Sequence, residues 1–105
     1  MNIRKGKSED MKSVLELIHE LAIFENEPDA VVITVDDLVR DGFGEKPLFH
    51  VFVAEIENNQ KQKEIVGIAL YYYRYSTWKG KTIHLEDLIV KEKMRPYIFR
   101  AFIIS

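Results

Sequence analysis

Hydrophobic and polar positions follow a helical period in the first part of the chain. Apolar residues recur every three or four positions over residues 9–24, which predicts an amphipathic helix there. Ser8 directly precedes the acidic first turn of this segment and is the expected N-cap. A second, short helix is predicted to begin after Thr34 as its N-cap and to end near Asp41 and Gly42.

The second half of the chain has the period of β-strands. β-Branched and aromatic residues predict three strands, separated by a polar loop at 58–63 and a turn at 77–80; the strands cover 49–55, 64–75 and 82–90. A short first strand is expected near residues 2–4. The order β-α-α-β-β-β predicts an α+β fold with an antiparallel meander in its second half.

Composition limits the partners that this chain is expected to have. The 105 residues include 15 Lys and Arg against 17 Asp and Glu, so the net charge of −2 disfavours a nucleic-acid partner. The chain has no cysteine, which excludes a disulfide framework and a thiol nucleophile. The polar N-terminus lacks an export signal, and the longest apolar run is nine residues. We therefore expect a cytoplasmic protein with no membrane partner.

Two adjacent carboxylates, Glu86 and Asp87, interrupt the otherwise apolar last strand. A buried strand tolerates such charges where they are paired or functional, whereas an edge strand leaves them in solvent. Regular alternation predicts that His84 and Glu86 share one face and that Asp87 lies on the other with Ile83 and Leu85. The His84–Glu86 spacing suits a proton relay or two metal ligands. No other histidine has ligand spacing, so we expect an ordinary histidine and no metal site.

Three short segments carry a resemblance to a known family. The segments 41–45 (DGFGE), 75–80 (YSTWKG) and 85–90 (LEDLIV) resemble the diamine branch of the GCN5-related N-acetyltransferase (GNAT) superfamily, which includes spermidine/spermine and thialysine acetyltransferases. The likeness runs from about Ile3 to Arg95, and family members are longer. It implies a family-like part over residues 1–95 and a separate apolar tail over residues 96–105. It also implies acetyl transfer from acetyl-CoA to a primary amine of a diamine, polyamine or thialysine-like substrate.

The resemblance also assigns roles to residues. Glu86 takes the place of the general base, which acts through water, and the backbone of the strand that follows meets the pantetheine arm and thioester of acetyl-CoA. The implied substrate residues are Phe24, Glu25, Ser76, Trp78, Glu86 and Asp87, and the implied cofactor residues are Leu88, Ile89, Val90 and Arg95. Polyamine-type members have an acid in place of Ser76, so a small diamine or amino-acid-like substrate is favoured. Trp78 is read either as a cation–π wall or as a packing residue.

The amino-acid sequence departs from the family pattern after Arg95. A glycine-rich turn that cradles the CoA pyrophosphate is expected there, but Pro96 and bulky apolar residues follow instead. This departure predicts weak acetyl-CoA binding and little turnover. The apolar tail is expected to fold back on the sheet or to exchange between the subunits of a homodimer. The alternative functions are a non-catalytic, self-associating module and an amine-binding domain without catalysis.

Overall fold

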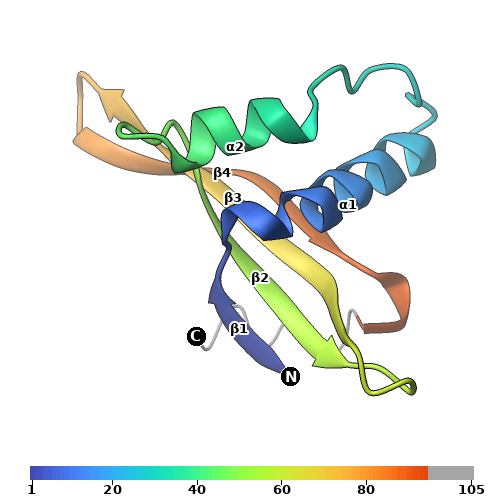
Figure 1. Cartoon of the computed structure of the whole chain (residues 1–105). Helices are drawn as coiled ribbons and strands as arrows, with labels where there is room; N and C mark the ends of the chain where they lie inside the picture. Colours follow the sequence, from blue (N-terminus) through green and yellow to red (C-terminus); the bar gives the residue numbers. More distant parts are fainter. Residues whose placement is uncertain (95–105) are drawn as a thin grey trace.

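A computed structural model describes residues 1–94 of the chain. The sheet has four strands in the order β1-β2-β3-β4, and each neighbouring pair is antiparallel. The predicted order of elements is confirmed (Figure 1). The elements are β1 (Asn2–Lys5), η1 (Ser8–Asp10), α1 (Met11–Phe24), α2 (Val35–Phe43), β2 (His50–Glu57), β3 (Lys63–Ser76), β4 (Gly80–Val90) and η2 (Glu92–Met94). No helix within these residues is long and apolar enough to cross a membrane.

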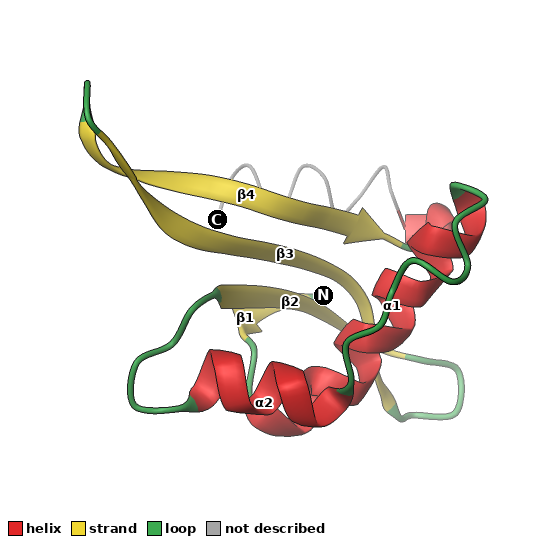
Figure 2. Cartoon of the chain, turned by 90° about the horizontal axis from the view of Figure 1, so that it is seen from above, coloured by secondary structure: helices red, strands yellow, loops and turns green. Residues whose placement is uncertain are grey.

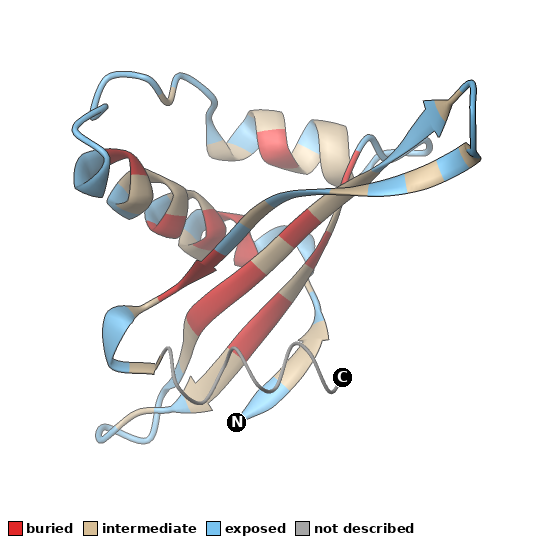
Figure 3. Cartoon of the chain, turned by 180° about the vertical axis from the view of Figure 1, so that it is seen from behind, coloured by how far each residue is buried: buried red, intermediate tan, exposed pale blue. Residues whose placement is uncertain are grey.

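Both long helices lie on the same face of the sheet (Figure 2). The apolar stripe of α1 packs with Leu38 of α2 against alternate residues of the three longer strands. This main core contains Met11, Val14, Leu17, Leu38, Phe49, Val51, Val53, Ile68, Leu70 and Ile89. In Figure 3 the buried residues form bands across the middle of the sheet and along the helices. The apolar side of the helices therefore packs directly on the apolar side of the sheet, as the amphipathic pattern requires.

The two helix starts differ from each other in how they are capped. Thr34 caps α2 as predicted: its hydroxyl accepts the N–H of Asp37 at 3.1 Å, and the Asp37 carboxylate accepts the N–H of Thr34 at 2.9 Å. Ser8 is not the N-cap of α1, so that prediction was wrong. The chain first forms the 3₁₀ turn η1, and the Asp10 carboxylate accepts the N–H of Lys7 at 2.7 Å. The Asp10 carboxylate thus satisfies the Lys7 amide at the start of this turn.

The opposite face of the sheet has a smaller apolar cluster. Ala54, Val66 and Val90 are buried there and pack with Ile3, Ile56 and Met94. Further along the β3–β4 hairpin, the same face exposes large apolar side chains, among them Tyr73, Ile83 and Leu85. The predicted apolar tail, residues 96–105, lies outside the described residues.

Candidate active site

A β-bulge in β4 decides where the two adjacent carboxylates point. Leu70 pairs with Asp87 while Tyr71 pairs with Leu85, so Glu86 is an extra residue on β4. Leu70 belongs to the core under the helices, and residues directly opposite in a sheet share a face. Asp87 therefore lies on the helix side, and the expectation that it shares a face with Leu85 was wrong. A bulge inserts one residue and breaks the alternation on which that expectation rested.

Glu86 lies on the helix side as well. Its carboxylate Oε2 is 3.4 Å from Nε2 of His84, and His84 pairs with Tyr72, which packs against the core under the helices. The predicted pairing of His84 with Glu86 on one face is thus confirmed. Two consecutive carboxylates on one face of a strand, impossible in a regular strand, result from the single inserted residue.

Glu25 joins these two acids from another element. It follows directly after α1, and its N–H donates to the carbonyl of Leu21 at 3.0 Å, which continues the last helical turn. Burial raises the pKa of the half-buried Asp87 carboxyl, and the charges of Glu86 and Glu25 raise it further. The end of α1 and the middle of β4 thus bring three carboxylates into one field. Such a field attracts a cationic group.

The environment of His84 involves a residue that sequence reasoning did not single out. Arg74 of β3 donates from Nη1 to Nδ1 of His84 at 3.2 Å. The Tyr72 ring lies against the imidazole, with 4.9 Å between the ring centroids. Counting outward from the β3–β4 turn pairs Tyr72 with His84 and Arg74 with Thr82, so the predicted hairpin already contained this signal. No group of three metal-ligating side chains is found within residues 1–94.

The structure does not bring all the predicted substrate residues together within one chain. Ser76 lies at the tip of the β3–β4 hairpin, where its hydroxyl accepts the N–H groups of Trp78 and Lys79 at 3.2 Å each. Trp78 is 94% exposed there. Gly80 begins β4, and the six residues from it to Glu86 span about 20 Å. The hairpin tip therefore lies well away from the carboxylates of its own chain, as its extension in Figure 1 shows.

The remaining predicted residues lie close to the acids in the sequence. Phe24 is the last residue of α1 and is exposed, next to Glu25. Leu88, Ile89 and Val90 continue β4 beyond the bulge and pair with Ala69, Ile68 and Gly67 of β3. Within residues 1–94, β4 is the last strand of the sheet, so its backbone groups on the side away from β3 face no described strand. Arg95 lies outside the described residues.

Sequence comparison relates the chain to amine acetyltransferases. It is 46% identical over 96 residues to the thialysine N-epsilon-acetyltransferase of Bos taurus, and this match covers 89% of the chain and 56% of that protein. It is also 46% identical over 92 residues to the spermidine/spermine N(1)-acetyltransferase-like protein 1 of Homo sapiens, covering 86% of the chain and 13% of that protein. The chain thus spans about half the length of the bovine relative, and less of the human one. No family model matches it.

Solved structures agree with this relation at the level of the fold. A possible acetyltransferase from Clostridium difficile superposes with a TM-score of 0.65 at 15% identity, covering 98% of this chain and 65% of that one. A Trypanosoma brucei acetyltransferase gives a TM-score of 0.63 at 21% identity, covering 98% and 69%. The resemblance noted in the sequence is confirmed. The chain is a homologue of the spermidine/spermine and thialysine N-acetyltransferases, and it has the N-terminal part of the GCN5-related N-acetyltransferase fold.

Proposed function

We propose that this chain belongs to an enzyme that transfers the acetyl group of acetyl-CoA to a primary amine of a diamine or a thialysine-like substrate. The observation that carries the proposal is the group of Glu25, Glu86 and Asp87: burial raises the pKa of Asp87, and the charges of Glu86 and Glu25 raise it further. A protonated amine placed among these acids relieves their mutual repulsion. The names of the sequence relatives support acetyl-CoA and an amine as the two substrates.

Each acid has a distinct task in the proposed reaction. Asp87 and Glu25 hold a cationic end of the substrate, and Glu86 takes a proton from the reacting ammonium through one water molecule. The neutral nitrogen then bonds to the acetyl carbon, the carbon–sulfur bond breaks, and the electron pair leaves with the sulfur of CoA. The nitrogen loses its second proton as the amide forms, and the thiolate takes up a proton to give the CoA thiol. Glu86 suits the role of base because its side chain is 53% exposed and reaches solvent, whereas Asp87 is half-buried.

The backbone after the bulge supplies the second half of the proposed site. Backbone N–H groups at a strand edge can hold the pantetheine arm and the thioester oxygen, which gains negative charge as the amine attacks. Leu88, Ile89 and Val90 follow the acids directly on the outer strand of the described sheet. In the proposed reaction, the amine lies beside Glu86 and the thioester lies along the residues that follow on the same strand.

An acetyl-transfer assay tests this function. The chain is incubated with acetyl-CoA and a panel of thialysine, a short diamine and spermidine, and the release of CoA thiol is followed. We expect slow release that saturates only at high acetyl-CoA, in keeping with the weak acetyl-CoA binding predicted from the sequence after Arg95, with Glu86→Gln lowering kcat by about 100-fold or more, the range for removal of a general base. Glu57→Gln is the matched control, because Glu57 lies exposed at the far end of β2. An unchanged rate in Glu86→Gln, or no release with any amine, would contradict the proposal.

One observation favours self-association as a second function. The outer face of the β3–β4 hairpin exposes Tyr73, Ile83 and Leu85 by 47%, 64% and 52%. Neighbouring exposed apolar side chains of this kind mark association surfaces. We expect light scattering after size exclusion to give the mass of a homodimer, and Ile83→Lys to shift the chain toward the monomer. A wild-type monomer at micromolar concentration removes this second function and leaves the acetyl-transfer assay unaffected.

A further inference from the structure

The contact between Arg74 and His84 fixes which nitrogen of the imidazole carries a proton. Arg74 Nη1 lies 3.2 Å from Nδ1 of His84. A guanidinium has only donors and stays charged at any pH that proteins tolerate, so Nδ1 has to accept. In a neutral histidine with an accepting Nδ1, the proton is on Nε2. The arrangement therefore selects the Nε2–H tautomer.

The protonated nitrogen faces the proposed base. Nε2 of His84 lies 3.4 Å from Oε2 of Glu86, which is longer than a well-formed N–H···O bond and acts mainly as a charge–dipole attraction. The Tyr72 ring supports the imidazole from one side. The imidazole is thus held between Arg74 at one nitrogen and Glu86 at the other, with an aromatic ring against it.

This geometry decides between the roles left open for His84 by its spacing from Glu86. Nε2 already carries a proton, and Nδ1 accepts from Arg74. Neither nitrogen can therefore take a proton from Glu86. The same contacts leave neither nitrogen free to ligate a metal. We propose that His84 is a positioning residue for Glu86: Arg74 sets its tautomer, and its Nε2–H orients the Glu86 carboxylate toward the incoming amine. This role rests on the proposed function of Glu86 as the base.

The tautomer is tested without any enzymatic activity. The full chain is labelled with ¹⁵N-histidine, and long-range ¹H–¹⁵N correlations are recorded at about pH 8, above the ordinary histidine pKa of about 6.5. The chain has three histidines, so the signal that disappears in His84→Gln is assigned to His84. We expect a single Nε2–H form that becomes a tautomer mixture in Arg74→Met and stays unchanged in Arg40→Met. An Nδ1–H form, or no change in Arg74→Met, overturns the inference.

A pair of substitutions at position 84 tests the positioning role. The amide nitrogen of Gln reaches the place of Nε2, whereas that of Asn reaches only the place of Nδ1. With an amine substrate and acetyl-CoA, we expect His84→Asn to lower kcat about tenfold, less than loss of the base itself. His84→Gln should restore most of the rate, and the KM for the amine should stay within about twofold in both. Equal losses in the two variants, or none in either, overturn the role.

The two experiments separate this inference from the proposed function. If the wild-type chain releases no CoA with any amine while His84 shows the Nε2–H form, the proposed function fails and the tautomer assignment stands. If the chain turns over amines but His84 shows the other tautomer, the function stands and the positioning role is removed.

Discussion

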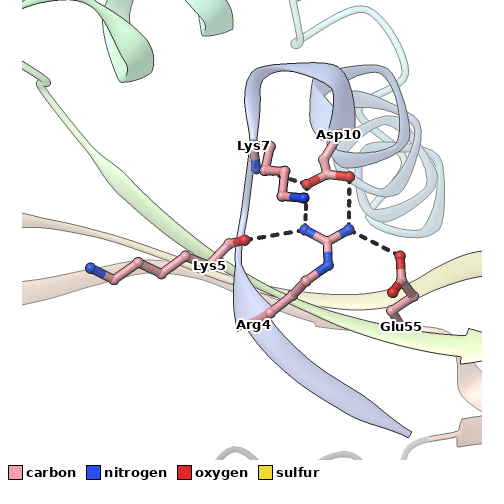
Figure 4. A network of polar contacts seen from close by, with 5 residues as sticks. All are labelled: Arg4, Lys5, Lys7, Asp10 and Glu55. Atoms are coloured by element: carbon pink, nitrogen blue, oxygen red, sulfur yellow. Dashed lines mark hydrogen bonds and ion pairs between the residues drawn. The ribbon is translucent and has the colours of Figure 1, made fainter.

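A three-residue ion cluster ties the first strand to the start of α1, and removing its cation is expected to destabilise the whole fold. Arg4 of β1 donates to both carboxylate oxygens of Asp10, at 2.7 and 3.0 Å, and to Glu55 of β2 at 3.0 Å (Figure 4). Side-chain exposures are 23%, 10% and 13% for Arg4, Asp10 and Glu55. Since Asp10 directly precedes α1, the cluster fixes the helix whose other end positions Glu25.

The magnitude follows from this partial burial. Removing one partner of a fully buried ion pair costs about 3–5 kcal/mol, and an exposed pair contributes about 0–1 kcal/mol. Arg4→Met leaves two carboxylates facing each other with little solvent, so we expect a loss of about 3 kcal/mol in the free energy of unfolding. Asp10→Asn retains the shape and some hydrogen bonding, and we expect a loss of about 2 kcal/mol.

Urea unfolding measures both losses. The transition should be followed by far-ultraviolet circular dichroism, because Trp78 is exposed in the folded chain and its fluorescence reports little on unfolding. Arg40→Met is the matched control: Arg40 pairs with Asp37 and Asp41 on the exposed side of α2, and its loss should leave the midpoint unchanged within error. Equal midpoints for the Arg4 and Arg40 variants would refute the reasoning.

The pH dependence gives an independent check of the same cluster. The Arg4 guanidinium lowers the pKa of Asp10 and the pKa of Glu55 by hydrogen bonding to their carboxylates. An acid with a lowered folded pKa contributes stability above its unfolded value, about 3.9 for Asp and 4.3 for Glu, and loses it as the pH falls through the folded value. The stability difference between wild type and Arg4→Met should therefore shrink below about pH 4. A constant difference would show that Arg4 acts through packing alone.

Three further substitutions test other features of the fold and site. Asp87→Asn should raise the urea midpoint at pH 7 and weaken amine binding measured by calorimetry. Because the pKa of Asp87 is raised in the folded chain, its ionised form destabilises the fold as the pH rises from about 3.9 through the folded value. The midpoints of wild type and Asp87→Asn should therefore coincide near pH 3. Gly42→Ala should destabilise by about 1–3 kcal/mol in the same urea assay, since the added Cβ would lie 2.4 Å from the Phe49 ring. Thr34→Ala should lower the free energy of unfolding by about 1 kcal/mol through loss of the α2 cap, and Thr34→Ser should restore it.

The parts of the fold that depend on local pattern were predictable from the sequence. Helix α1 begins at Met11, within two residues of its predicted start, and the Thr34 cap was recognised from its spacing to Asp37. Both features depend on neighbours within one turn, where periodicity and hydrogen-bonding capacity decide the outcome. The pairing of β3 with β4 near Trp78 was predictable for the same reason, because the paired residues can be counted outward from the turn.

Two features that the sequence did not reveal depend on distant pairing. The Arg4–Glu55 contact joins residues 51 positions apart. The bulge at Glu86 depends on how β4 aligns with β3, and a regular alternation of side chains carries no mark of an inserted residue. The wrong face was predicted for Asp87 because this one inserted residue was not foreseen. The roles of Phe24, Ser76, Trp78 and Arg95 stay predictions.

The bulge connects the stability of the chain with its proposed chemistry. Without it, Asp87 would turn to the outer face, away from the burial and the neighbouring charges of Glu86 and Glu25 that raise its pKa. With it, two like charges lie on one face near a third, an arrangement that opposes folding and that protonation of Asp87 or a cationic ligand relieves. The buried core, which includes Leu70 and Ile89 on either strand of this hairpin, offsets that cost. Ligand binding should consequently stabilise this chain by more than the added contacts alone, because the ligand also removes a repulsion present in the free protein.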